Sequence, residues 1–149
     1  MAGDTHAGNL SLVGGCLCLD FANTVDWRTG AHPREWLNDY GDLLAWSLHA
    51  AVLSPEEAGR LRAKAAGRPD EAVAVHRRAL DLREAIYRTF SRLAAGVQPE
   101  VGDLALINRE LSAALARLQV TRDEGGFTWR WEGQGEALDC LLWPVVRSA

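Results

Sequence analysis

Polar side chains interrupt an apolar stretch near the start of the chain, where Asp20, Asn23 and Thr24 lie among leucine, phenylalanine and valine residues. An unpartnered carboxylate or amide is costly to bury, so these groups either find hydrogen-bond partners inside the protein or line a pocket. Residues 17–25 are too few for periodicity to separate a strand from a helix. We favour a helix, because helical spacing places the three polar residues at positions i, i+3 and i+4, on one side.

A second candidate for a binding or ion-pairing group is the guanidinium of Arg83. It falls within the apolar face of a long predicted helix at 69–95. One stripe of that face repeats with the helical period and consists of Val75, Ala79, Leu82, Ile86, Phe90 and Leu93. Arginine stays charged at physiological pH, so a position inside this face requires a carboxylate partner.

Two interpretations of these residues remain open. In the first, Asp20 and Arg83 pair with each other and fasten the N-terminal segment to the long helix, while Asn23 satisfies local backbone groups. In the second, Asp20, Asn23 and Arg83 line a ligand pocket in which the planar guanidinium binds a carboxylate or a phosphate. We favour the pair, because a ligand that broke it would leave a buried charge uncompensated, at a cost of about 3–5 kcal/mol. Only the second interpretation predicts a cavity beside Arg83.

Two aromatic rings extend the candidate ligand-binding site. His76 lies one heptad before Arg83 on the same helix, although such a residue is more often a satisfied histidine on a helix face. Trp27 closely follows the Asn23-Thr24 pair and is the best candidate for the aromatic wall of a pocket, whereas core packing explains most of the six tryptophans. The predicted ligand is small and either anionic or aromatic. The predicted ligand-binding residues are Asp20, Asn23, Thr24, Trp27, His76 and Arg83.

The sequence lacks the motifs of common catalytic, metal and cofactor sites. Its histidines have no metal-ligand spacing, no Gly-x-Ser-x-Gly elbow occurs, and its glycine pairs lack the lysine of a phosphate loop. Cys16 and Cys18 are two residues apart and Cys140 is distant, so no Cys-x-x-Cys pattern forms. We interpret the three thiols as small buried hydrophobes in a reducing compartment. We therefore expect no catalysis, no metal and no cofactor.

The elements that must position these residues are mainly helical. Asp39 is a candidate N-cap, and Ser54-Pro55-Glu56-Glu57 is a capping box with proline in the first turn. Gly67 and Gly96 mark helix ends. The predicted helices span 17–25, 40–53, 55–66, 69–95, 99–118 and 135–149, the last perturbed at Pro144, with a loop at 26–38.

Towards the C-terminus the pattern changes from helical to alternating. A turn of sequence Asp-Glu-Gly-Gly joins the alternating runs 118–122 and 127–131, which predicts a β-hairpin. Phe127, Trp129 and Trp131 share one face of it, and we expect that face to pack onto the helices. The predicted fold class is mainly α, a single multihelical domain at 1–149 with a small antiparallel β-hairpin.

Composition excludes several classes of function. A chain of 149 residues is long enough for one domain with a core of its own. Its net charge of −4 argues against binding nucleic acid by itself, because duplex binding depends on clustered lysine and arginine. The N-terminus has no apolar signal core and no run reaches the length of a membrane span. We expect a cytoplasmic protein without membrane contact.

The segment Leu19-Asp20-Phe21-Ala22-Asn23-Thr24-Val25 resembles the Leu-Asp-Phe-x-Asn-Thr signature of the ABATE domain, found in a bacterial family described as stress-induced transcription regulators. The segment 82–87 looks like the second recurrent block of that family. The segment 143–149 looks like the start of the stretch that leads to the family's zinc finger. The resemblance covers most of the chain. Carried over by position, its signature residues here are Asp20, Asn23, Thr24 and Arg83.

The resemblance implies a regulatory role without catalysis. In the family, a CGNR-type zinc finger follows the ABATE domain and makes the contact with DNA. The zinc-binding cysteines and the Cys-Gly-Asn-Arg block of that module are missing from this sequence. The resemblance therefore implies that this chain is the sensing or dimerising half, with DNA as a partner only through the missing zinc finger. The acidic charge balance agrees with this division.

Three functions compete on the sequence alone. We favour binding of a small ligand near the signature residues. A self-association module, such as a homodimer, would instead expose a self-complementary apolar patch of several hundred Å². An enzyme of unknown class would need a cleft that holds a strongly perturbed titratable group and an orienting partner.

Overall fold

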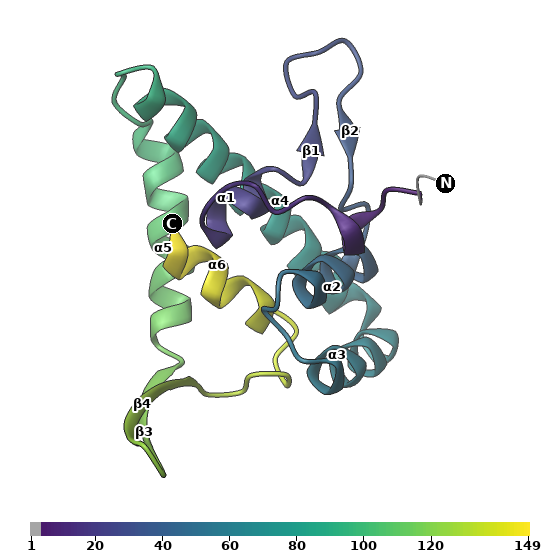
Figure 1. Cartoon of the computed structure of the whole chain (residues 1–149), viewed down its shortest axis with the longest axis vertical. Coiled ribbons are helices and arrows are strands. Elements are labelled where there is room, and N and C mark those ends of the chain that lie inside the picture. Colours follow the sequence, from purple (N-terminus) through teal and green to yellow (C-terminus); the bar gives the residue numbers. More distant parts are fainter. Residues whose placement is uncertain (1–3) are drawn as a thin grey trace.

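The computed structural model describes residues 4–149, and Figure 1 shows how its elements are arranged. Over this range the chain forms six α-helices and two antiparallel two-stranded sheets, which confirms the predicted mainly α fold class with small antiparallel elements. Within the same range, no helix combines the length and the apolar character needed to cross a membrane.

The helices are α1 (Leu17–Ala22), α2 (Tyr40–His49), α3 (Pro55–Gly67), α4 (Pro69–Ala94), α5 (Val101–Leu115) and α6 (Trp143–Ser148). Two single turns of 3-10 helix lie at Ala7–Asn9 and Cys140–Leu142. The first sheet pairs β1 (Val25–Asp26) with β2 (Arg34–Glu35), and the second pairs β3 (Leu118–Asp123) with β4 (Gly126–Trp131).

The two longest helices, α4 and α5, meet at the turn of residues 95–100 and diverge from it (Figure 1). The short helices α1 and α6 contact each other and fill the space between them, α1 against α4 and α6 against α5. Helices α2 and α3 pack together and cover the N-terminal part of α4. The first and last segments of the chain are thereby brought together on the longest helix.

The core lies where α1, α2 and α4 meet. Phe21 and Trp46 are both fully buried and their ring centroids are 5.1 Å apart. Leu82 and Ile86, from the predicted apolar stripe of α4, are also fully buried, whereas Leu93 near the end of that helix is half exposed. Burying these apolar groups holds α1, α2 and α4 together.

Local signals set most helix ends as predicted. The Ser54 hydroxyl accepts the Glu57 N–H at 3.2 Å, and the Glu57 carboxylate accepts the Ser54 N–H at 2.8 Å, which completes the capping box. The Asp39 carboxylate caps α2 by accepting the Asp42 N–H at 2.9 Å. Gly96 ends α4 with a φ of 70°, a left-handed conformation that glycine adopts without strain.

The first helix is shorter than predicted. It ends at Ala22, with Asn23 as its C-cap, so Asp20, Asn23 and Thr24 do not lie on one helical face. The predicted loop at 26–38 also contains a small element, because β1 pairs with β2 in the register Val25 to Glu35. Two residues in each strand are too few to show an alternating pattern in the sequence.

The C-terminal segment forms two short helices in place of the predicted single one. Gly133 and Gly135 adopt φ values of 79° and 73°, which a helix cannot include. A Cβ at Gly135 would lie 2.8 Å from side-chain atoms of both Glu57 and Arg60. Pro144 lies in the first turn of α6 and does not disturb the helix, because the first turn does not use that backbone N–H.

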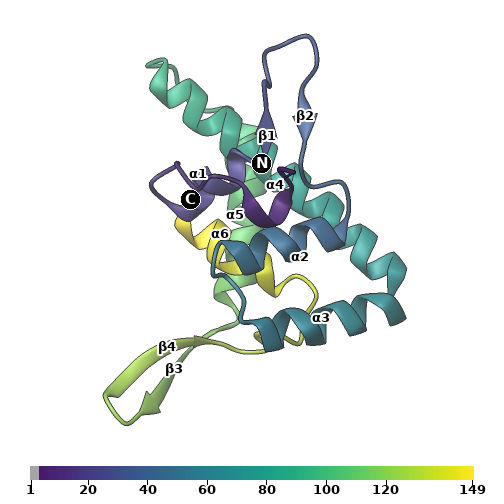
Figure 2. The same ribbon diagram turned by 45° about the vertical axis from the view of Figure 1, so that its right-hand side comes forward.

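The predicted hairpin is present, but its apolar face does not pack as expected. Trp131, next to the helices, lies 5.9 Å from the ring of Trp143. Further along, Phe127 and Trp129 are 80% and 60% exposed, so the prediction that they pack onto the helices is wrong. Figures 1 and 2 show the reason: the hairpin extends away from the helical body, beyond the end of α5.

Candidate functional site

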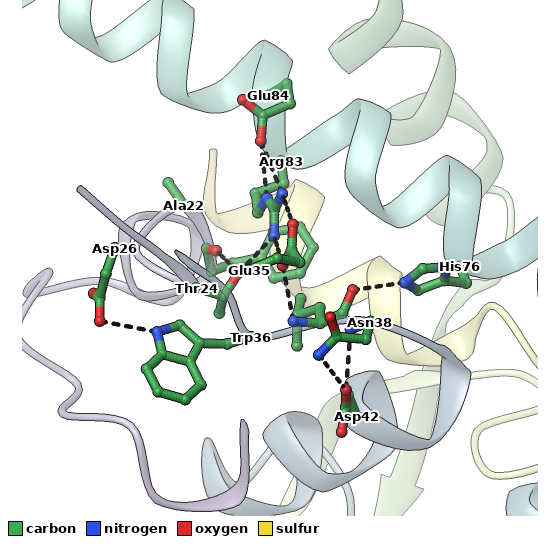
Figure 3. Close-up of polar contacts among 12 residues, drawn as sticks. Ala22, Thr24, Asp26, Glu35, Trp36, Asn38, Asp42, His76, Arg83 and Glu84 are labelled. Carbon is green, nitrogen blue, oxygen red and sulfur yellow. Dashed lines mark hydrogen bonds and ion pairs between the residues drawn. The ribbon is translucent and has the colours of Figure 1, made fainter. Parts of the chain in front are cut away.

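The guanidinium of Arg83 is buried where the middle of α4 meets β2 and the end of α1 (Figure 3), and only 3% of the residue is exposed. Its Nη1 and Nη2 atoms donate to the two carboxylate oxygens of Glu35, each at 2.7 Å. This two-pronged contact is the strongest geometry available to an arginine and a carboxylate. Nη1 also donates to Thr24 Oγ1 at 3.2 Å, and Nε donates to Glu84 at 3.0 Å.

Backbone groups complete this arrangement around Arg83. The Thr24 hydroxyl, which accepts from Arg83, donates in turn to the Phe21 carbonyl at 2.8 Å. The Glu35 carboxylate accepts a further hydrogen bond from the Leu37 N–H at 2.8 Å. Each nitrogen of the guanidinium therefore has an oxygen partner, which is the condition under which a buried charge is tolerated.

A second arginine closes the outer side of the cluster. Arg28 forms an ion pair with Glu84 and donates to the Ala22 carbonyl at 2.6 Å. Its guanidinium carbon also lies 4.2 Å from the centre of the Tyr87 ring, a cation–π contact. Two guanidinium groups and two carboxylates thus make a cluster without net charge. We call Arg83, Glu35, Thr24, Glu84 and Arg28 the Arg83 cluster.

The electrostatics of Glu35 follow from this geometry. Burial by itself raises the pKa of a carboxyl group, but the Arg83 hydrogen bonds, the Leu37 N–H and the Arg83 charge all lower it. The lowering effects are larger together, so the pKa of Glu35 lies below its ordinary value. The carboxylate is therefore held in its charged form.

The predicted site residues separate into those that reach Arg83 and those that do not. Thr24 contacts the guanidinium, whereas the Asp20 carboxylate accepts the Gly14 N–H at 2.7 Å instead. The predicted pairing of Asp20 with Arg83 is therefore wrong. Asn23 is exposed at the end of α1, and His76 donates from Nε2 to the Leu37 carbonyl at 2.8 Å. His76 thus supports the backbone beside Glu35 and does not touch Arg83.

Arg83 has the carboxylate partner that its buried position requires, but this partner is Glu35 and not Asp20. Glu35 lies in a stretch predicted as a loop, among twenty acidic residues that the sequence offers. The partner is determined by the β1–β2 pairing, which turns Glu35 towards α4 (Figure 3). No local pattern at Glu35 distinguishes it from the other acidic residues.

Beside the Arg83 cluster lies an open hollow with a volume of about 370 Å³. Its polar lining comes from Asn23, Asp26 and Ser11, and its apolar lining includes Trp27. Trp27 is 74% exposed and has a φ of 50°, which is uncommon for a bulky residue. The remaining lining residues are Leu10, Val13 and Val25.

The β1–β2 hairpin connects the hollow with the Arg83 cluster. Strand β1 contributes Val25 and Asp26 to the hollow, and β2 contributes Glu35 to the cluster. Trp36 adds a further link, because its indole N–H donates to the Asp26 carboxylate at 3.0 Å (Figure 3). The Arg83–Glu35 contact therefore positions the lining of the hollow without being part of it.

The chemistry available in the hollow is recognition through a ring, an amide and a carboxylate. Over residues 4–149, no group of three or more histidine, cysteine or acidic side chains has the geometry to hold a metal ion. The most strongly shifted groups are Tyr40 and Cys140, whose pKa values burial in the core raises, that of Cys140 to about 11. Neither residue lines the hollow.

Comparison with known proteins agrees with the resemblance noted in the signature segments. The model of the ABATE family, described as "Putative stress-induced transcription regulator", matches residues 15–149. That range includes every residue of the Arg83 cluster and most of the lining of the hollow. A comparison with curated proteins and one with solved structures found no significant match. The chain belongs to the ABATE family of transcription regulators.

Proposed function

We propose that this chain is the ligand-sensing domain of a transcription regulator and that it binds a small, flat ligand in the hollow beside Trp27. The observation that carries the proposal is the indole of Trp27, held exposed by a backbone conformation with positive φ at the edge of a hollow that Asn23 also lines. An unfavourable backbone conformation that presents a large ring to solvent is typical of a binding site.

The charge of the lining decides the class of ligand that we propose. Among the described residues that line the hollow, Asp26 is the one ionisable group, and none is a lysine or arginine. An anion would therefore have to engage Arg83, and releasing Glu35 for it would leave a carboxylate without its partner, at a cost of about 3–5 kcal/mol. A neutral or cationic aromatic ligand is favoured, because Trp27 offers a π face and Asp26 a negative charge.

A charge series on one ring system tests this proposal. The probes are tryptamine, indole and indole-3-acetate, which present a cation, a neutral ring and an anion. In a thermal-shift titration we expect tryptamine to raise the Tm most, indole less, and indole-3-acetate not at all. In the Trp27→Ala variant, the shift caused by tryptamine should disappear while the Tm without ligand stays within a few degrees of wild type.

Val101→Ala serves as the control, because Val101 is 83% exposed on α5 and belongs neither to the hollow nor to the β3–β4 hairpin. This variant should keep the full response to tryptamine. The proposal would be overturned if all three probes left the Tm unchanged, or if Trp27→Ala responded as wild type does. A response to indole-3-acetate alone would overturn the proposed charge preference.

We also propose where the regulator contacts DNA and where it works. Contact with DNA belongs to a zinc finger of the kind that the family resemblance implies, and not to this chain. The domain works in the bacterial cytoplasm during a stress response and performs no catalysis. The net charge of −4 supports the first point, because phosphate contacts require clustered basic groups.

A specific observation also favours self-association as a second function. Strands β3 and β4 carry an exposed apolar strip, in which Val120 faces Trp129 across the hairpin and Phe127 lies two pairs further out, on the same face. The exposed fractions are 57%, 60% and 80%. Exposed aromatic residues gathered on one surface indicate an interaction site.

The edge of β4 suits a second copy of the same strand. Beyond the paired strands, the Glu132 N–H donates to the Arg117 carbonyl at 2.7 Å. Because hydrogen-bonded pairs alternate in an antiparallel ladder, Phe127 and Trp129 direct their backbone groups away from β3, towards the open edge. A two-fold axis at Thr128 would pair Phe127 with Trp129 of the partner subunit, in hydrogen-bonded register.

The charges at the hairpin agree with this register. The same two-fold axis sets Arg130 opposite Gly126 of the partner subunit. Gly126 has no side chain, and its cross-strand neighbour in the hairpin is Asp123. The Arg130 guanidinium could therefore reach across the glycine to the partner subunit's Asp123. An interface in which one surface complements its own copy is the requirement for a two-fold dimer.

Sedimentation equilibrium tests the self-association. We expect wild type to form a dimer and Phe127→Asp to remain a monomer, because the substitution places a charge in the aromatic strip. Val101→Asp is the matched control: Val101 is 83% exposed on α5, and its variant should dimerise as wild type does. A monomeric wild type, or equal dimerisation of Phe127→Asp, would rule out this interface.

A further inference from the structure

Two thiols lie next to each other at the start of α1. The Sγ atoms of Cys16 and Cys18 are 3.5 Å apart. Cys16 is exposed, in contrast to the expectation that all three cysteines are buried, and Cys18 is fully buried. We propose that Cys16 and Cys18 form an oxidisable dithiol, which a hydroperoxide converts into an intramolecular disulfide. This proposal is independent of ligand binding in the hollow.

The local backbone allows the two sulfur atoms to approach. A disulfide requires an S–S distance of about 2.05 Å, so the sulfurs must close by about 1.5 Å. Cys16 is the N-cap of α1, but its side chain makes no capping hydrogen bond and can rotate. Gly15, which precedes it, has a φ of 78° and no atoms within 4 Å of the position of a Cβ, so the backbone has room to adjust.

The two thiols differ in their surroundings, and this difference indicates which of them reacts first with the oxidant. Burial raises the pKa of Cys18, although its contact with Ser148 partly offsets this effect, so Cys18 stays protonated at neutral pH. The exposed Cys16 is the sulfur that an oxidant in solution can reach. Cys16 is therefore oxidised first, and Cys18 is the resolving thiol.

The reaction balances in two steps. The Cys16 thiolate attacks one oxygen of the hydroperoxide, the O–O bond breaks, and the leaving oxygen takes up a proton, which leaves a sulfenic acid on Cys16. The Cys18 sulfur then attacks the Cys16 sulfur, the S–O bond breaks, and the hydroxyl leaves as water with the proton of Cys18. With hydrogen peroxide, two thiols and one oxidant thus give one disulfide and two molecules of water.

Oxidation of the two thiols should also affect the C-terminal end of the chain. The Cys18 thiol donates to the Ser148 carbonyl at 3.3 Å, and the Cys18 N–H donates to the Ser148 hydroxyl at 3.2 Å. These contacts join α1 to the last turn of α6. A disulfide removes the thiol proton and turns the Cys18 sulfur towards Cys16, so the Ser148 carbonyl loses its donor. Oxidation should therefore loosen the end of α6.

Peptide mapping after treatment with hydrogen peroxide and alkylation with iodoacetamide tests the disulfide. Arg28 is the first lysine or arginine in the chain, so trypsin releases Cys16 and Cys18 in one peptide, 1–28, and Cys140 in another, 131–147. In the reduced protein, peptide 1–28 should carry two alkyl labels. After oxidation it should carry none and be lighter than the unlabelled peptide by two hydrogen atoms.

Three variants separate the possible outcomes. Cys140→Ala should oxidise as wild type does, whereas Cys16→Ser should keep the label on Cys18. In Cys18→Ala the sulfenic acid has no resolving thiol, so dimedone should trap it on Cys16. The proposal would be overturned if peptide 1–28 kept both labels under conditions that oxidise Cys140, or if it were recovered as a cross-link between two chains.

Hydrogen exchange measures the effect on α6. Amides of residues 143–149 should exchange several-fold faster in the oxidised protein and return to the original rate after reduction. Cys16→Ser treated in the same way should show no change. Equal exchange in the oxidised and reduced wild-type protein would overturn the coupling to α6, even if the disulfide forms.

Discussion

Arg83 can be buried because each nitrogen of its guanidinium donates to an oxygen, which offsets the cost of removing the charge from water. Glu35 takes two of its hydrogen bonds, and Thr24 and Glu84 take the others. A lysine could not replace it, because an ammonium group lacks the planar fork that matches a carboxylate. The signature residues Thr24 and Arg83 therefore share a structural task, which is to fix the end of α1 and the β1–β2 hairpin on α4.

Substitution of Arg83 should show this dependence directly. We expect Arg83→Lys to lower the free energy of unfolding by about 1–3 kcal/mol, because one cation remains but the two-pronged contact is lost. Arg83→Ala should lower it by about 3 kcal/mol, the lower end of the range for a broken buried pair, because Glu35 is one-third exposed and can regain water. Urea unfolding followed by circular dichroism measures both values. Equal stability of wild type and Arg83→Ala would contradict the role of the Arg83 cluster.

At the scale of elements, the β1–β2 hairpin depends on contacts outside itself. Each strand has two residues, and an isolated two-stranded hairpin is marginal in water. Its anchors are the Glu35 contact with Arg83 and the Trp36 contact with Asp26. The hairpin should therefore open locally before the helices unfold.

Lowering the pH should destabilise the β1–β2 hairpin. The pKa of Glu35 is lower in the folded protein than its ordinary value of 4.5, so between these two values the unfolded chain binds more protons. The stabilisation is complete above about pH 4.5 and is lost as the pH falls through the folded pKa. We expect the protection factors for hydrogen exchange at residues 25–35 to fall over this window, and those of Glu35→Gln to be low already at pH 7.

Asp103→Asn provides the control for this measurement. The pKa of Asp103 is also lowered, first by its hydrogen bonds with Arg88 and further by the charge of that residue, but Asp103 lies on α5. Its variant should keep the acid response of residues 25–35. If Asp103→Asn removed that response, the acid sensitivity would belong to the α4–α5 contact and not to the hairpin.

At the scale of the whole molecule, many of the arginines form ion pairs with carboxylates of the same chain. Arg78 pairs with Glu110 and Asp139, and Arg88 pairs with Asp103. The first of these arginines joins α4 both to α5 and to the segment before α6. Guanidinium groups engaged in this way are not available to neutralise phosphates, which adds to the effect of the net charge of −4.

This distribution predicts that the 149-residue chain does not bind duplex DNA at physiological salt. In a fluorescence-anisotropy titration we expect no saturable change, which corresponds to a Kd weaker than about 10⁻⁴ M. A Kd in the micromolar range that weakens steeply with added salt would contradict the prediction. It would also move the proposed DNA contact from the zinc finger into this chain.

Local signals were sufficient to predict most of the helices and the second hairpin. Ser54 and Glu57 form the predicted capping box, and Gly96 ends α4 as expected. Such signals operate within a few residues and can be identified without knowing the fold. The C-terminal segment was predicted less well, because its turns at Gly133 and Gly135 fit against α3, which the local sequence does not show.

The requirement for a carboxylate beside Arg83 follows from sequence alone, because a permanent charge inside an apolar stripe must be compensated. The identity of that carboxylate is a tertiary property, since Glu35 reaches Arg83 only after the β1–β2 pairing turns it towards α4. The exposure of Trp27 and Phe127 was likewise decided by the fold. The sequence determines which side chains are apolar. Whether a given ring is buried depends on which distant segments of the chain pack over it.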